Sequence, residues 1–312
     1  MDIPIMIDVS DVSKNYGDLM AVDSLNLQIP EGEIFGFIGP NGAGKTTTIR
    51  MLATLLLPTK GEIRIAGMNP EEEPREVRRM IGYMPDAFGV YPDLTVNEYL
   101  DFFAAAYRIA PEKRSTLIDD VLELTDLTQK KKELVEALSR GMKQRLCLAK
   151  TLLHDPSILL LDEPASGLDP RARIEIRELL KELKKMKKTI LISSHILSEL
   201  SDFCTSIGII EKGKLVVAGS LDDIEARITL TKTYRLTSLD KLEMIAEALK
   251  SLGIQSIELN DGYLQFAADQ TDEQIANLLT TLVRDNFRIT SLYPVTANLE
   301  DLFMKITKGE VS

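Results

Sequence analysis

Short, mostly apolar runs recur along the first two thirds of the chain and alternate with segments of helical pattern. They fall at residues 33–38, 158–161, 189–193 and 207–210. Strands that are apolar on both faces are typical of parallel sheets, because helices cover both faces of such sheets. The alternation therefore predicts an α/β core with a largely parallel sheet.

Ahead of this core, residues 3–12 and 20–29 show β-like stretches, interrupted by a polar turn at 15–18. We expect them to form an N-terminal antiparallel β subdomain. A helical apolar pattern then covers residues 46–57 and stops at Pro58, which cannot continue a helix.

A mainly helical stretch runs from about residue 95 to 154, and we assign a helical subdomain to residues 87–155. Within it an apolar stripe recurs at helical spacing, at Met142, Leu146, Ala149 and Leu153. We interpret this stripe as core packing. We interpret His154, which follows it, as a residue at a helix end.

The pattern changes after residue 231. Residues 233–237 alternate like a strand, and a helical pattern ending at Gly253 follows. Asp261-Gly262 separates two further strands and is a strong hairpin signal. A second helix around 275–282, a strand at 288–294 and a helix at 298–306 complete the chain.

This order, β-α-β-β-α-β, predicts a small ferredoxin-like α+β domain. We therefore divide the chain into an α/β domain at 1–219, a linker at 220–230 and an accessory domain at 231–312, for dimer contacts or regulation.

Composition excludes several classes of protein. The formal charge of −11 over 312 residues argues against a protein that binds nucleic acid through bulk positive charge. Cys147 and Cys204 lie in no CxxC or Cys/His cluster, so we expect buried thiols rather than disulfides or zinc. The N-terminus has no basic segment typical of a secretory signal, and no apolar run is long enough to cross a membrane. If the protein serves transport, the membrane path belongs to another chain.

A phosphate-binding pattern follows the strand at 33–38. Residues 39–46 read Gly-Pro-Asn-Gly-Ala-Gly-Lys-Thr and open a predicted helix, as GxxxxGK[ST] requires. The glycines let successive N–H groups point at phosphate oxygens, Lys45 reaches the β- and γ-phosphates, and the Thr46 hydroxyl is placed for Mg²⁺. We predict ATP contacts from Gly39, Pro40, Asn41, Gly42, Ala43, Gly44, Lys45, Thr46 and Thr47.

A pair of carboxylates supplies the second half of a phosphoryl-transfer site. Asp162 and Glu163 end the apolar strand 158–161, at the edge where open α/β sheets bind ligands. We predict that Asp162 binds Mg²⁺ and that Glu163 orients or deprotonates the attacking water.

With these motifs in place, residues 3–219 resemble the ATP-binding cassette (ABC) family. Residues 138–146 resemble its signature motif, and residues 166–169, Ser-Gly-Leu-Asp, resemble its D-loop. His195 resembles the switch histidine that contacts the γ-phosphate, and Tyr16 resembles the aromatic residue that stacks on adenine. The resemblance implies a P-loop NTPase core of the ABC type, with ATP and Mg²⁺ as its ligands.

The signature motif offers a second anion site. Ser139 and Gly141 begin a predicted helix, so a hydroxyl and N–H groups lie at its positive end. In the family this site closes on the ATP of a partner subunit. We therefore predict partner contacts from Ser139, Arg140, Gly141, Met142 and Asp169, and a homodimer, because one chain carries both halves of the site.

The chain departs from the family pattern at two places. Asp86 stands where the Q-loop usually has Gln, and it can accept from a Mg²⁺-bound water but cannot donate as an amide does. We keep Asp86 as a catalytic and Mg²⁺ residue. Arg140 and Met142 replace the commoner Gly and Gln of the signature, and the backbone donors survive both changes.

The sequence Asn298-Leu-Glu-Asp-Leu-Phe-Met resembles the tail of ATPases that serve ABC type-2 exporters. The implied function is ATP hydrolysis that energises export through a separate permease, on the cytoplasmic face of the cell membrane, with no direct binding of nucleic acid. A soluble non-transport cassette ATPase and a low-turnover, nucleotide-dependent regulator remain as alternatives.

Overall fold

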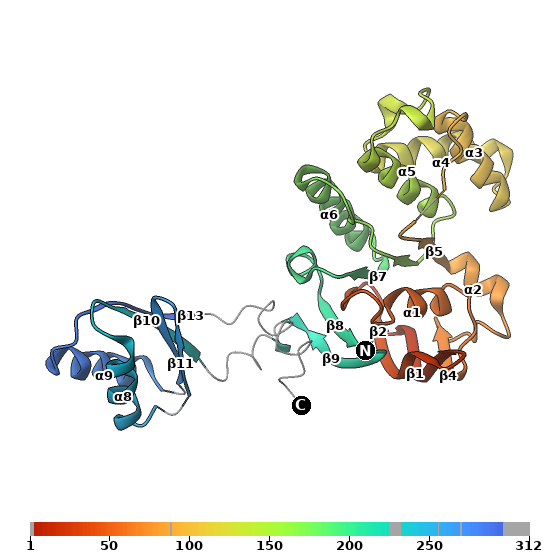
Figure 1. Cartoon of the computed structure of the whole chain (residues 1–312). Helices are drawn as coiled ribbons and strands as arrows, with labels where there is room; N and C mark the ends of the chain where they lie inside the picture. The colour runs from red at the N-terminus through yellow and green to blue at the C-terminus, as the bar shows by residue number, and fades with distance from the viewer. Residues whose placement is uncertain are drawn as a thin grey trace. The chain divides into compact units, whose positions relative to one another are not determined.

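The computed structural model describes residues 3–87, 89–221, 223–224, 232–254, 256–268 and 270–295. The chain divides into two compact units, Met1–Leu221 and Asp222–Ser312 (Figure 1). No helix among the described residues is both long and apolar enough to cross a bilayer.

A six-stranded sheet forms the centre of the first unit, in the order β5-β6-β7-β3-β8-β9. Its strands are β3 (Ile34–Ile38), β5 (Ile81–Met84), β6 (Ile158–Leu161), β7 (Thr189–Ser194), β8 (Ser206–Glu211) and β9 (Lys214–Ser220). The first five strands of this order pair in parallel, and β9 is antiparallel to β8. Every residue of β3, β6 and β7 is buried, which confirms the parallel core predicted from the apolar runs.

An antiparallel sheet of three strands, in the order β2-β1-β4, packs with this core. It contains β1 (Ile5–Tyr16), β2 (Leu19–Pro30) and β4 (Lys60–Ile65). The predicted turn is shorter in the structure, because β1 and β2 extend to either side of Gly17 and Asp18. Helix α1 (Lys45–Leu52) contacts both β2 and β6, so one apolar core joins the two sheets around it.

The prediction that this helix extends to residue 57 was wrong, because α1 ends at Leu52. Thr54 takes a left-handed conformation with φ 61°. The Leu55 N–H donates to the Arg50 carbonyl at 2.9 Å and the Thr54 N–H to that of Met51 at 3.1 Å, the pattern of a Schellman cap. Such a cap usually carries Gly, and Thr at this position gave no signal in the sequence.

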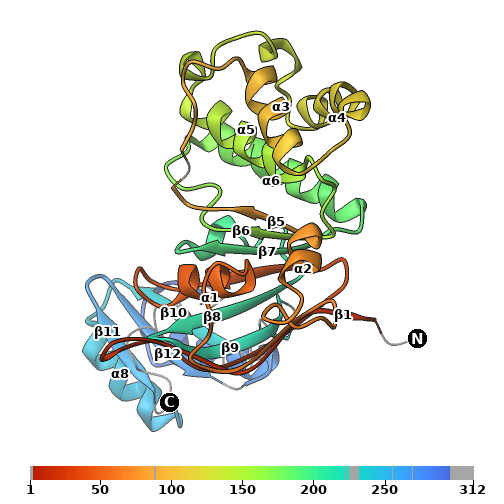
Figure 2. The same ribbon diagram turned by 90° about the vertical axis from the view of Figure 1, so that its right-hand side faces the viewer.

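The stretch between β5 and β6 is helical, as predicted. It contains α3 (Val96–Ala106), α4 (Pro111–Leu124) and α5 (Arg140–Leu152), which contact one another, and the short helices η1 (Thr128–Lys130) and η2 (Val135–Ala137). Thr95 and Glu98 form a capping box at the start of α3. Figures 1 and 2 show this helical group on the side of β5, β6 and β7 away from the three-stranded sheet.

Within this group Leu146, Ala149 and Leu153 are buried, which confirms core packing for the apolar stripe, although Met142 is half-buried. His154 follows α5 and stacks on Tyr107, with ring centroids 4.2 Å apart. Its Nε2 lies 2.9 Å from the Ile81 carbonyl oxygen. Burial lowers the pKa of this imidazole. His154 thus lies just past the end of a helix, as predicted, and it also packs against Tyr107.

Among the described residues, the first unit also contains the helices α2 (Pro74–Met80), α6 (Pro170–Lys185) and η3 (Leu197–Glu199). Cys147 and Cys204 are free and buried, as predicted, and burial raises the pKa of both thiols.

The second unit has the predicted ferredoxin-like order. It contains β10 (Lys232–Ser238), α8 (Leu242–Ser251), β11 (Ile257–Asn260), β12 (Tyr263–Ala268), α9 (Asp272–Arg284) and β13 (Ile289–Val295). Its antiparallel sheet has the order β11-β12-β10-β13, and alternate strand residues such as Tyr234 and Phe266 pack with the helices in one core. The helix predicted at 298–306 and most of the predicted linker lie outside the described residues.

Candidate functional site

The loop between β3 and α1 is shaped by its glycines. Gly42 has φ 80° and Gly44, the residue before α1, has φ 111°. A Cβ on Gly44 would lie 2.6 Å from the carbonyl oxygen of Ala21 on β2, so no side chain fits there. The loop therefore curls tightly into the N-terminus of α1, where free N–H groups favour an anion.

Lys45 holds this loop from within. Its Nζ donates to the carbonyl oxygens of Gly39 at 2.6 Å and Pro40 at 3.2 Å, and lies 3.4 Å from Glu163 Oε1. The side chain is only 6% exposed. A cation with so little contact with water is placed to bind another anion strongly.

Asp162 follows β6 and is buried beside the loop. Its Oδ1 accepts a hydrogen bond of 2.7 Å from Ser193 Oγ, at the end of the neighbouring strand β7. Burial raises the pKa of the Asp162 carboxyl, and the nearby Asp86 and Glu163 raise it further, while hydrogen bonds from Ser193 and Thr46 lower it. Ser193 was not among the predicted site residues, and its position at the end of an apolar strand was the signal that could have found it.

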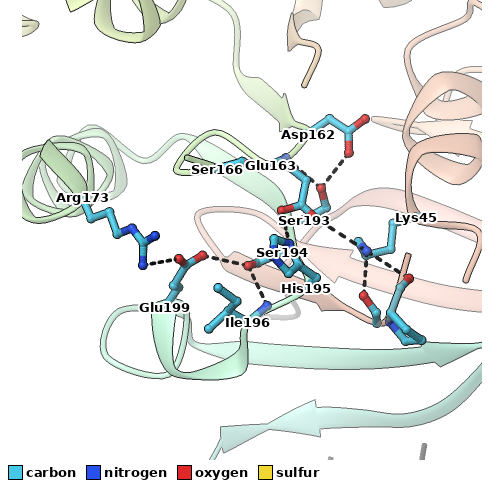
Figure 3. Close-up of polar contacts among 12 residues, drawn as sticks. Lys45, Asp162, Glu163, Ser166, Arg173, Ser193, Ser194, His195, Ile196 and Glu199 are labelled. Carbon is cyan, nitrogen blue, oxygen red and sulfur yellow. Dashed lines mark hydrogen bonds and ion pairs between the residues drawn. The ribbon is translucent and has the colours of Figure 1, made fainter. Parts of the chain in front are cut away.

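Glu163 lies at the centre of the site (Figure 3). Its Oε2 is 2.8 Å from His195 Nδ1, and its N–H donates to Ser193 Oγ at 2.9 Å. Glu163 has φ 51°, a left-handed conformation that is costly for a non-glycine residue and typical of functional sites. Two neighbouring strands, β6 and β7, thus deliver a carboxylate and an imidazole to one point beside Lys45.

A cavity of about 420 Å³ opens onto this point. It brings together most of the predicted ATP-site residues and four others, Leu19, Met20, Ala21 and Ser166. The predicted residues that line it are Tyr16, Asn41, Gly42, Ala43, Gly44, Lys45, Thr46, Thr47, Asp86, Glu163 and His195. Gly39 and Pro40 do not line it, and instead bind the Lys45 ammonium through their carbonyl oxygens.

The predicted signature residues lie outside this cavity. Ser139 caps α5 by accepting from the Met142 N–H, and a Cβ on Gly141 would come within 3.2 Å of the Ala172 Cβ on α6. Arg140 Nη2 donates to the Ser166 carbonyl oxygen at 3.1 Å. The start of α5 therefore rests on residues 166–169.

Two further contacts support the same region. Asp169 caps α6, because its Oδ1 accepts from the Ala172 N–H at 2.9 Å. Gln144 Nε2 donates to the Pro164 carbonyl oxygen, directly after Glu163. Gln144 was not predicted from the sequence. Its hydrogen bond connects α5 to the segment that carries Glu163.

Two family models match the chain. The model described as "ABC transporter" matches residues 22–166, and the model described as "ATP-binding protein DrrA1-3-like, C-terminal domain" matches residues 219–307. The first match contains the phosphate loop, Asp86, the signature residues and the Asp162-Glu163 pair.

Curated relatives align along almost the whole chain. The bacitracin transport ATP-binding protein BcrA of Bacillus licheniformis is 38% identical over 97% of this chain and 98% of its own length. The linearmycin resistance ATP-binding protein LnrL of Bacillus subtilis is 31% identical over 97% and 98%. The Nod factor export ATP-binding protein I of Rhizobium etli is 34% identical over 98% and 94%.

Solved structures share much of the fold of this chain. The ATP-binding subunit of an ABC transporter is 30% identical, with a TM-score of 0.65, and the match covers 78% of this chain and 99% of that one. The dimeric ABC transporter cassette MJ0796 is 29% identical with a TM-score of 0.63, over 69% and 99%. A dimer of that cassette in a post-hydrolysis state, with ADP and Pi bound, matches with a TM-score of 0.63 at 28% identity, over 69% and 99%.

Proposed function

Because the chain belongs to the family of ABC transporter ATP-binding proteins, we propose that it energises export through a separate transmembrane permease by hydrolysing ATP. ATP binding draws two copies together and hydrolysis releases them, so the phosphate chemistry becomes movement. The observation that carries the hydrolysis of ATP is the 2.8 Å contact between Glu163 and His195, beside Lys45 at the phosphate loop.

ATP binds in the cavity next to the phosphate loop. The N–H groups of the loop and the Lys45 ammonium bind the β- and γ-phosphates, as suits a helix N-terminus. The Tyr16 ring, which is 45% exposed at the same cavity, stacks on the adenine.

Hard oxygen donors for Mg²⁺ gather next to this loop. The Thr46 hydroxyl hydrogen-bonds the Asp162 carboxylate, and Asp86 lies close enough to raise the pKa of Asp162. These three side chains suit Mg²⁺, which prefers oxygen ligands and shares them with phosphates. Held by these side chains, Mg²⁺ would supply positive charge next to the phosphate oxygens.

Glu163 is the general base that takes a proton from the attacking water. An ionised carboxylate only accepts, so the proton of the hydrogen bond between Glu163 and His195 belongs to His195 Nδ1. His195 thereby orients the base, and because it also lines the cavity it contacts the γ-phosphate of the bound ATP. The backbone of Glu163, fixed by Ser193, keeps the carboxylate near Lys45.

The signature residues act on the ATP of the second copy. Ser139, Arg140, Gly141 and Met142 lie at the N-terminus of α5, outside this chain's own ATP cavity. Asp169 begins α6 beside them. A homodimer that places this helix end on the partner's γ-phosphate uses both halves of the site, and the likeness to a dimeric cassette supports it.

The export assignment is supported by relatives whose names include Nod factor export and transport of bacitracin. We place the protein on the cytoplasmic face of the membrane, held there by the permease. The accessory domain, residues 231–312, serves dimer contacts or regulation.

The test of the ATPase is Glu163→Gln with Glu182→Gln as its control. Glu182 is exposed on α6 and pairs with the nearby Lys185, so its neutralisation leaves the site intact. Loss of a general base lowers turnover by about a hundredfold or more. We expect this loss in Glu163→Gln, with ATP-stabilised dimers visible by size-exclusion chromatography. Turnover within a few-fold of wild type would refute Glu163 as the base.

Two alternatives give different results. Asp86 in place of the usual Gln favours a low-turnover regulator, which would show little steady-state hydrolysis in the wild-type protein. For a soluble non-transport ATPase, a tagged protein purified from detergent-solubilised membranes would bring no permease. A stoichiometric multi-span protein in that preparation supports the transporter, and ribosomal or DNA-repair partners contradict it.

A further inference from the structure

A chain of polar contacts lies behind the loop that carries His195 (Figure 3). Ser194 Oγ donates to Glu199 Oε2 at 2.9 Å, and Ser194 Oγ also accepts from the Ile196 N–H at 3.0 Å. Ser194 and Ile196 are the residues directly before and after His195. Glu199, in η3, thus binds the side chain that fixes both flanks of His195.

The other end of this chain reaches the segment that follows Glu163. Arg173 Nη1 lies 2.9 Å from Glu199 Oε1. Arg173 Nε donates to the carbonyl oxygen of Leu168 at 3.0 Å, within residues 166–169. One guanidinium therefore joins this segment to Glu199, and through Ser194 to His195.

Apolar packing on this side of the His195 loop is incomplete. A cavity of about 390 Å³ lies between α6 and the segment 192–203. Arg173 and Glu199 line it, together with Ile174, Ile196 and Phe203. Leu197 and Leu200 of this segment are buried, but core side chains do not fill the cavity, so the polar contacts of Glu199 help to hold the loop in place.

Glu199 is suited to this task by its surroundings. Its side chain is only 13% exposed, although it carries a charge, and Arg173 is 40% exposed. A carboxylate so far out of water needs its partners. Removing it takes away the ion-pair partner of Arg173, which keeps only its bond to the Leu168 carbonyl, and the acceptor of the Ser194 hydroxyl. Both oxygens are used, since Oε1 meets Arg173 and Oε2 meets Ser194.

Resting on the proposed function, we propose that Glu199 is a positioning residue that holds His195 against Glu163 and ties its position to residues 166–169 through Arg173. Glu199 does not touch the ATP cavity. It acts through the loop, so it sets the rate of the chemical step and leaves the ATP contacts of the phosphate loop unchanged. A movement of residues 166–169 therefore shifts the position of His195 through the contacts of Arg173 and Glu199.

The test compares Glu199→Ala and Glu199→Gln with Glu182→Ala in steady-state ATPase assays. A misplacement of a reacting group by about 1 Å can lower the rate about a hundredfold. We expect Glu199→Ala to lower kcat by about tenfold to a hundredfold with KM within about threefold. Glu199→Gln keeps an acceptor for Ser194 and should recover part of kcat. Glu182→Ala, on the exposed face of α6, should match wild type.

A double-mutant cycle with His195 separates positioning from a structural effect. If Glu199 acts through His195, then Glu199→Ala causes little further loss in a His195→Ala background, measured by single-turnover release of labelled phosphate. Equal fractional losses in both backgrounds would overturn the inference, as would an unchanged kcat in Glu199→Ala. Circular dichroism of Glu199→Gln checks the fold. Absence of hydrolysis in wild type would contradict the proposed function itself, and wild-type turnover with unaffected Glu199 variants contradicts only this inference.

Discussion

Alanine substitutions at two glycines of the phosphate loop test its geometry directly. Gly42 and Gly44 both have positive φ, at 80° and 111°. A Cβ on Gly42 would meet no atom within 4 Å, whereas a Cβ on Gly44 would lie 2.6 Å from the carbonyl oxygen of Ala21. The two variants therefore share backbone strain, and only Gly44→Ala adds a collision with the backbone of β2.

The expected magnitudes follow from these contacts. A left-handed conformation costs an alanine about 1–2 kcal/mol, and the stiffer unfolded chain offsets about 0.4–1 kcal/mol of this. Gly42→Ala should therefore lower the free energy of unfolding by about 1 kcal/mol. For Gly44→Ala, strain of about 1–3 kcal/mol combines with overpacking of about 1–3 kcal/mol, because a backbone carbonyl cannot move aside like a side chain. After the same offset from the stiffer unfolded chain, we expect a loss of about 3 kcal/mol.

Differential scanning calorimetry of the nucleotide-free protein measures this difference. For a domain of this size each 1 kcal/mol lowers Tm by about 2–4 °C, so Gly42→Ala should lower it by about 3 °C and Gly44→Ala by about 10 °C. Gly67→Ala is the matched control, because Gly67 has φ 81° and open space around its Cβ position, away from the loop. It should resemble Gly42→Ala. Equal shifts for Gly42→Ala and Gly44→Ala would refute the geometry.

Three further predictions concern titratable groups. The pKa of Asp162 is raised in the folded chain, so its ionised carboxylate destabilises the folded state at any pH above the unfolded pKa. Asp162→Asn should therefore raise the Tm of the nucleotide-free protein at neutral pH. The same variant should lose the stabilisation that Mg²⁺ and ATP give the wild-type protein. A lower Tm in thermal unfolding would contradict this. Asp86 raises the pKa of Asp162, so Asp86→Asn should shift the acid limb of the ATPase pH profile to lower pH, and a shift upward would be inconsistent with the structure. His154 has a lowered pKa in the folded chain, so stability should fall as pH drops below the unfolded value of about 6.5. In denaturant titrations at several pH values, the free energy of unfolding of His154→Gln should depend less steeply on pH than that of wild type. An unchanged pH dependence would exclude His154 as its source.

Much of the fold was readable from local patterns. The apolar runs predicted the strands β3, β6, β7 and β8 because a strand covered on both faces needs apolar residues at every position. The Asp261-Gly262 pair predicted the hairpin between β11 and β12. The end of α1 was missed, because its cap places Thr54, rather than a glycine, in a left-handed conformation.

The sequence also predicted the phosphate loop and the Asp162-Glu163 pair, because the functional residues of each motif are adjacent in the chain. Ser193, Gln144, Glu199 and Arg173 were not. Each of these residues matters through a contact with a residue 5 to 31 positions away, and no local pattern marks such a partner.

The sequence by itself determined the alternation of strands and helices, the phosphate-binding loop and the presence of a carboxylate pair at a strand end. These depend on backbone preferences and on side chains close together in the chain. Only the tertiary structure decided that His195 lies 2.8 Å from Glu163 and that Arg173 and Glu199 join two loops behind it. The physical reason is the pairing of β6 with β7, which brings residues 30 and more positions apart to one edge of the sheet.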